Sequence, residues 1–248
     1  MHFLLLGATG RTGRHVVSEL LSQGHTAVAL VRDPGSLGPR PGLTQVTGSP
    51  LSKADIEAAL SAAPSPTTTT PTTTPCDAAI ITLNANRVSE SPFAAPLTPP
   101  RFLADSAANA CEVLEAAGVR RVVVMSTVGA GDSWPNLPLL SKAFMGWTNV
   151  RFALEDHDLL DREVRLTGMD WTLVRASRLV FDDPGQPARA GAGAGAGGAG
   201  GVGDVRTLPG DGVGMGVADS VRVSSAARFM VKVAVEGLFV KSAVVIRD

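Results

Sequence analysis

Three regularly spaced glycines, between an apolar run and an amphipathic stretch, constrain this chain most. Residues 2–6, HFLLL, suit a buried strand, and Gly7, Gly10 and Gly13 follow at intervals of three residues. Residues 11–23 then carry apolar side chains at helical spacing. A buried strand that turns directly into a helix is typical of a βαβ unit, so the first 30 residues predict the start of a parallel sheet.

The same alternation continues along the chain. Further strands are predicted at 26–31, 43–48, 77–83, 120–127, 170–176 and 242–247, and helices at 53–60, 101–117, 150–167 and 224–236. The strands are continuous runs of Val, Ile and Leu, which indicates a parallel sheet covered by helices on both faces. The predicted fold is therefore α/β, a Rossmann-type doubly wound parallel sheet.

Two low-complexity segments interrupt this pattern. Residues 64–75 are PSPTTTTPTTTP, and residues 188–204 are rich in Gly and Ala. Neither composition can bury much apolar area, so both are predicted to be disordered surface loops. The second segment has no lysine and no strand-to-helix junction, which argues against a phosphate-binding loop. We expect one domain over 1–248 with two loop insertions.

Composition excludes several functional classes. The chain has 22 basic and 23 acidic side chains and no basic run, so binding to nucleic acid or to an anionic membrane is not expected. Its two cysteines and four histidines form no metal-ligand pattern, and none of its apolar runs is long enough to span a membrane. The N-terminus lacks the pattern of a secretory signal. We expect a cytoplasmic protein with reduced thiols and no metal.

The glycine turn predicts a dinucleotide site. Gly7 permits the tight turn, Gly10 leaves room for a diphosphate beside the backbone, and Gly13 lets the helix pack close to the strand. The free N–H groups at the start of the helix favour an anion. The predicted cofactor-binding residues of this turn are Gly7, Thr9, Gly10, Arg11, Thr12 and Gly13.

The end of the second predicted strand bears on the choice between NADP and NAD. An NAD site usually has an acid there, whereas this strand ends at Arg32, whose guanidinium can bind a 2′-phosphate. Asp33 follows and argues in the opposite direction. Arg11 either reaches the same phosphate or is a solvated helix charge. On balance the sequence favours NADP(H).

Several motifs together resemble a known family. GATGRTG, LVRDP, DAAIITL, GVRRVVVMST and TGMDWTLVRASRL occur in the order and spacing of atypical short-chain dehydrogenase/reductases. Within these the chain is similar to the NAD(P)H-binding, NmrA-like group that includes biliverdin-IXβ (flavin) reductase. The resemblance implies that the nicotinamide lies near Leu83, Asn84, Ser126 and Thr127, and that Thr127 replaces a serine that lies beside the substrate in that group.

One departure from the wider family concerns the proton donor. Typical short-chain dehydrogenases use a Tyr-xxx-Lys pair, but this chain has no tyrosine, and the corresponding positions are Leu154 and Asp158. The flavin reductase group also works without such a tyrosine. The resemblance therefore implies hydride transfer by positioning, with a proton from solvent.

Four residues are candidates for catalysis, each with a plainer alternative. Ser126 and Thr127 either bind the nicotinamide amide or a substrate carbonyl, or bond local backbone. His157, which matches the family's position, is either a proton donor or part of a solvated acidic helix face. Lys142 either faces the pocket or is an ordinary surface lysine.

A cluster of large side chains follows the fifth predicted strand. It comprises Trp134, Phe144, Met145 and Trp147, in a chain with only 4% aromatic residues. These side chains either form the wall of a site for a flat, apolar substrate or simply pack within the long connection after the strand.

The interpretation that these observations favour is an NADPH-dependent reductase. Its expected partner is a flat conjugated or aromatic small molecule, with secondary metabolism as the suggested setting, and the chain is expected to act as a monomer or homodimer. Two alternatives remain: a non-redox isomerase or cyclase that uses the same pocket, and an NmrA-like regulator that senses the dinucleotide without turnover.

Overall fold

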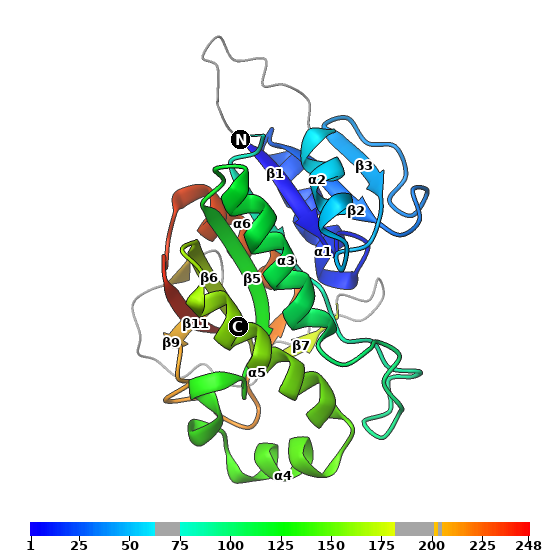
Figure 1. The fold of residues 1–248 in the computed structure, drawn as a ribbon. Coiled ribbons are helices and arrows are strands. Elements are labelled where there is room, and N and C mark those ends of the chain that lie inside the picture. Colours follow the sequence, from blue (N-terminus) through cyan, green and yellow to red (C-terminus); the bar gives the residue numbers. More distant parts are fainter. Residues whose placement is uncertain (63–74, 182–200, 203–204) are drawn as a thin grey trace.

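A nine-stranded sheet forms the centre of the computed structural model, which describes residues 1–62, 75–181, 201–202 and 205–248 (Figure 1). The strand order is β3-β2-β1-β4-β5-β6-β11-β9-β8. From one edge to the other the strands are β3 (Leu43–Thr47), β2 (Thr26–Val31), β1 (His2–Leu6), β4 (Ala78–Ile81), β5 (Arg121–Thr127), β6 (Asp170–Ala176), β11 (Ser242–Arg247), β9 (Val205–Pro209) and β8 (Gly201–Val202).

Helices cover both faces of the sheet, as the continuous apolar strands predicted. Alternate side chains of β1 enter two different cores: Phe3 and Leu5 pack with α1 (Arg11–Ser22) and α6 (Val223–Glu236). Leu4 and Leu6 belong to the core on the opposite face, which packs against α2 (Lys53–Ser61), α3 (Phe102–Ala116) and α5 (Val150–Leu166). The doubly wound Rossmann-type fold is confirmed.

The predicted strands and helices agree with the structure to within two residues at each end. Several elements are additional. β9 pairs antiparallel with β11, so one edge of the sheet is not parallel. β7 (Arg178–Val180) and β10 (Ser220–Arg222) form a separate two-stranded sheet. The long connection after β5 contains a 3₁₀ helix, η1 (Gly131–Asn136), and α4 (Leu139–Trp147).

Most of the two predicted insertions lies outside the described residues, namely 64–74 of the first and 188–200 and 203–204 of the second. Residues 201–202 correct the prediction of a disordered loop, because they form β8 and pair antiparallel with β9. Strand pairing at a sheet edge uses backbone groups, so it does not require the apolar side chains that this segment lacks. Within the described part of the chain, none of the helices has both the length and the apolar character of a membrane span.

Candidate active site

At two positions of the first turn, other backbone atoms lie so close that only glycine fits. Gly7 has φ +87°, and a Cβ on it would lie 2.7 Å from both the carbonyl carbon and the oxygen of Thr82, at the end of β4. A Cβ on Gly13 would lie 2.1 Å from the carbonyl oxygen of Gly7. The Thr82 hydroxyl donates to the same Gly7 oxygen at 3.2 Å. The turn is thus wedged between α1 and β4, and only glycine fits at these two positions.

Gly10 differs from these two glycines because its missing side chain faces mostly open space. Among the described residues beyond its chain neighbours, the only atoms within 4 Å of a Cβ there are the carbonyl oxygens of Gly7 at 3.2 Å and Thr82 at 4.0 Å. Gly10 is also the N-cap of α1, which has no side-chain capping bond and no acidic residue in its first turn. An uncapped helix N-terminus beside open space is suited to bind an anion.

A cavity of about 930 Å³ begins at this turn and extends along the carboxyl ends of the sheet strands. Thr9, Gly10, Arg11 and Thr12 line one end of it. The rest is lined by the segment after β4, the ends of β5 and β6, the helices α4 and α5, residues 178–181 around β7, and residues 215–219. β1 and β4 are neighbours in the sheet, and the chain crosses from one side of β1 to the other at this point. This is the switch point at which α/β sheets bind their ligands.

Three buried polar atoms around this cavity lack hydrogen-bond partners among the described residues. They are the Ser126 and Ser177 hydroxyl oxygens and Nδ1 of His157. All three residues line the cavity, and each is more than nine-tenths buried. Ser126 is in β5, Ser177 directly follows β6, and His157 is in α5. Buried groups of this kind are normally paired, so their clustering at one cavity marks the place where a bound molecule would satisfy them.

The family comparison agrees with this geometry. A family model described as NAD(P)H-binding matches residues 7–204, which include the glycine turn, the strand ends and α5. The chain belongs to the NAD(P)H-binding family. A comparison with curated proteins finds no match.

Solved structures share the fold of this NAD(P)H-binding protein at low sequence identity. ChuY, an anaerobilin reductase from Escherichia coli O157:H7, is 17% identical with a TM-score of 0.67, over 100% of this chain and 97% of that chain. A short-chain dehydrogenase/reductase from Veillonella parvula, solved in complex with NADP, is 14% identical with a TM-score of 0.69, over 100% and 94% of the two chains. These likenesses establish the shared Rossmann-type architecture.

The residues present fit a nicotinamide dinucleotide. The open space at Gly10 and the uncapped start of α1 suit a diphosphate, and the cavity continues from there to Leu83, Asn84 and Ser126. All the predicted cofactor residues except Gly7, Gly13 and Arg32 line this cavity. Gly7 and Gly13 instead shape the turn behind it.

Thr127 has a local partner, unlike Ser126. Its hydroxyl donates to the carbonyl of Val128 at 3.3 Å, although the residue lines the cavity. Ser177 was missed by the sequence analysis. Its position directly after a buried strand, beside Ala176, is the signal that could have indicated it.

His157 corrects an expectation, because it is not on a solvated helix face. Its neighbour Asp156 accepts hydrogen bonds from the backbone N–H groups of Leu103 and Ala104 at 2.8 and 3.0 Å, at the start of α3. Asp156, one of the acidic residues that suggested an exposed face, is therefore engaged in a tertiary contact. Burial lowers the pKa of His157 to about 4, although the carboxylate of Asp161 acts in the opposite direction. The imidazole is therefore neutral at neutral pH, so it can form hydrogen bonds but does not carry the extra proton of a general acid.

This pKa predicts a pH-dependent stability. The folded-state pKa of about 4 lies below the ordinary 6.5, so between these values only the unfolded chain binds the proton. Stability should therefore rise from pH 4 to pH 6.5 and be lost as pH falls. Relative to His157→Gln, the wild type should lose about 2–3 kcal/mol more of its unfolding free energy between pH 7 and pH 4.5. Urea unfolding at both pH values measures this, with His15→Gln as the control. Equal losses in wild type and His157→Gln would contradict the low pKa.

The three predicted basic residues differ in their positions relative to the cavity. The Lys142 ammonium donates to the carbonyl of Pro135 at 2.8 Å, and Lys142 does not line the cavity, which corrects its placement at the pocket. Arg32 is exposed and also lies outside the lining. Arg11 does line the cavity, where its guanidinium pairs with Glu90 at 2.9 Å and lies 3.7 Å from the ring centroid of Phe181.

Arg14 is a basic residue that the sequence analysis missed. Its Nε donates to the carbonyl of Thr9 at 3.0 Å, and its NH2 group donates to the carbonyl of Ser36 at 3.0 Å. It therefore joins the glycine turn to the segment that follows β2. Its place one residue after the third glycine is the signal that could have indicated it.

The large side chains after β5 divide into two groups. Phe144 and Met145 line the cavity, whereas Trp134 and Trp147 do not. At the positions of the missing Tyr-xxx-Lys pair, Leu154 lines the cavity, and the Asp158 carboxylate accepts from the backbone N–H of Gly131 at 2.6 Å. Neither side chain can replace the tyrosine as a proton donor that lysine activates.

Proposed function

We propose that this chain is an NADPH-dependent reductase of a flat conjugated or aromatic small molecule. The observation that carries the proposal is the single cavity that joins the uncapped start of α1 to the unpaired groups of Ser126, Ser177 and His157. One end suits a dinucleotide diphosphate, and the other offers hydrogen bonds to a second molecule. The apolar side chains of Phe144, Met145 and Leu154, which line the same cavity, suit a flat, apolar body.

The chain's own residues bind and orient, with no dedicated proton donor. When bound, the dinucleotide supplies the hydride. The Ser126 and Ser177 hydroxyls can donate to a carbonyl oxygen of the substrate or to the nicotinamide amide, and neutral His157 can complete the same set. Holding the reactants in a fixed geometry then provides most of the acceleration, and water supplies the proton.

Arg32 and Arg14 support the preference for NADPH. Arg32 directly follows β2, at the position where a 2′-phosphate is recognised in this type of fold. Asp33, which argued against this from sequence, accepts a hydrogen bond from the backbone N–H of Gly35 at 3.1 Å and so takes part in a local turn. Arg14 adds a second positive charge nearby, on the side of α1 that contacts Ser36.

Replacing Arg32 by alanine should weaken NADPH binding selectively. A lost charge-assisted contact is worth about 1.5–3 kcal/mol, so the Kd for NADPH should rise roughly 10–100-fold while the Kd for NADH stays the same. Calorimetric titration with both cofactors measures this, and Arg40→Ala, another exposed arginine after β2, is the control. An equal loss for both cofactors would remove Arg32 from the phosphate site.

Replacing Ser126 by alanine should slow turnover roughly 10–100-fold, because one orienting hydrogen bond is lost from the reacting complex. The stability of the fold should not decrease, since the Ser126 hydroxyl has no hydrogen-bond partner in the described structure. Ser106→Ala is the matched control: its hydroxyl is also buried and unpaired, but it does not line the cavity. If both variants keep the wild-type kcat, Ser126 does not orient the reactants.

The proposal as a whole is tested by NADPH oxidation with a panel of quinones and flavins and analysis of the products. We expect stoichiometric NADPH loss and reduced product with at least one conjugated acceptor. Product formed without NADPH loss would point to an isomerase or cyclase instead. Tight dinucleotide binding without turnover on the whole panel would point to a dinucleotide-sensing regulator.

A further inference from the structure

Helix α4 exposes an apolar stripe to solvent. None of its nine residues is buried. Leu140, Phe144 and Trp147 follow one another at helical spacing and lie on one side of the helix. They are 73%, 52% and 85% exposed. We call these three residues the α4 stripe. Figure 1 shows α4 at the end of the molecule, away from the sheet. Helices are stabilised mainly by packing an apolar face, so a stripe this exposed indicates a surface that something covers.

The α4 stripe continues the wall of the cavity. Leu140 and Phe144 line the cavity as well as being exposed, and Val88, on the segment after β4, does the same at 64% exposure. That segment reaches the end of α4, where the side-chain amide of Asn149 donates to the carbonyl of Phe93 at 2.8 Å. The apolar lining of the cavity therefore continues onto the exposed parts of Leu140 and Phe144, and Trp147 follows on the same side of α4, outside the lining.

The charge around this surface favours an uncharged occupant. Residues 139–149 contain one charged side chain, Lys142, and its ammonium is committed to the carbonyl of Pro135. Residues 91–100 contain none, whereas Arg87 and Glu90, on either side of Val88, line the cavity, and Glu90 pairs with Arg11. The cavity also holds the unpaired polar groups of Ser126, Ser177 and His157. The site is thus polar around these groups and apolar along α4.

We infer that the substrate is amphipathic: a conjugated carbonyl head that binds the polar groups and a hydrocarbon tail that lies along the α4 stripe. This deepens the proposed reductase function and rests on it for the identity of the head group. The tail accounts for the continuity of the stripe with the cavity, which a separate docking partner would leave unexplained.

Binding of benzoquinones that share one head group and carry zero, one or two isoprenoid units tests the inference. The titrations are made calorimetrically with NADP⁺ present, so that no turnover occurs. We expect the Kd to fall about tenfold for each unit, a gain consistent with partial burial of its carbons. In Trp147→Ser and Leu140→Ser, the ratio of Kd values for the tailless and tailed quinones should shrink at least threefold. Leu166→Ser, an equally exposed leucine at the far end of α5 (82% exposed), should keep the wild-type ratio.

Equal Kd values for tailless and tailed quinones, or an unchanged ratio in both stripe variants, would overturn the inference. If Trp147→Ser instead converts a dimer to a monomer in light scattering while the ratio stays constant, the stripe is covered by a second copy of the chain. The parallel NADPH oxidation assay separates the two proposals. Tail-dependent binding without oxidation would overturn the reductase but not the tail site. Oxidation without tail dependence would overturn only the tail site.

Discussion

Replacing Gly10 by valine is expected to abolish dinucleotide binding while leaving the domain folded. The new Cβ would lie 3.2 Å from the carbonyl oxygen of Gly7, a tight but local contact, and the rest of the side chain would occupy the open space at the start of α1. A diphosphate needs that space to reach the backbone N–H groups. The loss of two or three charge-assisted hydrogen bonds should raise the Kd by roughly a thousandfold, about 4 kcal/mol.

Titration of NADPH into the Gly10→Val protein measures this effect, and circular dichroism with thermal melting checks the fold. Gly146→Val is the control, because no atom lies within 4 Å of a Cβ at that position and Gly146 does not line the cavity. Wild-type affinity in the Gly10 variant would show that the diphosphate does not approach this turn.

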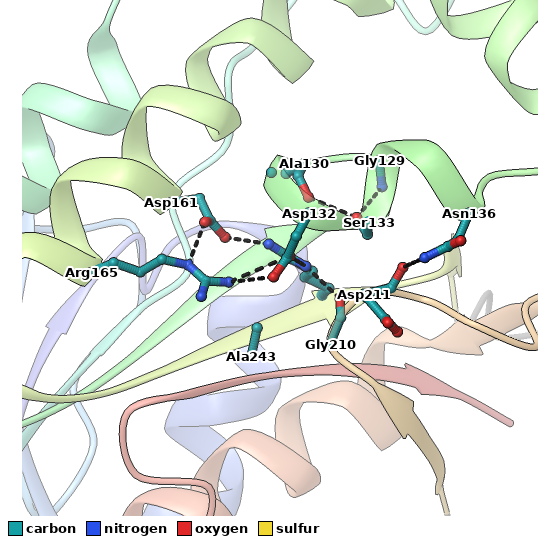
Figure 2. A network of polar contacts seen from close by, with 12 residues as sticks. Gly129, Ala130, Asp132, Ser133, Asn136, Asp161, Arg165, Gly210, Asp211 and Ala243 are labelled. Atoms are coloured by element: carbon teal, nitrogen blue, oxygen red, sulfur yellow. Dashed lines mark hydrogen bonds and ion pairs between the residues drawn. The ribbon is translucent and has the colours of Figure 1, made fainter.

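The second large effect is expected at Arg175, which is fully buried at the end of β6. Its guanidinium pairs with Asp161 at 2.5 Å and also with Asp132, and it donates to the carbonyl of Gly210 (Figure 2). Arg165 pairs with Asp161 at 2.6 Å in the same network. These contacts join η1 and α5 to the segment after β9, and other residues of α5 and of that segment line the cavity.

Arg175→Met should therefore destabilise the protein by about 3 kcal/mol, because it removes the fully buried partner of Asp161 and leaves that carboxylate to Arg165, which is partly exposed. For a chain of this size the melting temperature should fall by roughly 10 °C. Arg162→Met, an exposed arginine next to Asp161, is the control and should change stability by less than about 0.5 kcal/mol.

The double variant Arg175→Met with Asp161→Asn tests whether the loss of stability comes from the Asp161 carboxylate. The double variant should be more stable than Arg175→Met alone, since it removes the negative charge of Asp161 that Arg175 no longer balances. A melting temperature within about 2 °C of wild type in Arg175→Met would mean that the network contributes little to stability, contrary to its burial.

Local patterns in the sequence determined most of the sheet and its helices. Continuous apolar runs of the length of a strand can be buried only in a covered parallel sheet, so residues 26–31 and 121–127 could be placed without knowledge of their neighbours. The glycine turn was predictable for the same reason. At Gly13 the demand for a missing Cβ comes from Gly7 and Ala8, which are close in sequence. At Gly7 it comes from Thr82 and Leu83 after β4, so the sequence predicts this glycine from its place in the turn and not from that long-range contact. Helix α4 escaped prediction because it has only nine residues and no capping signal at its start.

The substrate end of the site was decided only by the tertiary structure. The acidic residues around His157 indicate a solvated helix face when read alone, but Asp156 binds the start of α3 and Asp161 pairs with Arg175 of β6. Ser177 and Ser126 are unremarkable serines until β5 and β6 place them beside one cavity without partners. Sequence periodicity reports which face of an element must be buried. It does not report which distant element provides the burial or the hydrogen bond, and at this end of the site those long-range contacts determine which groups are buried, paired or left free for a ligand.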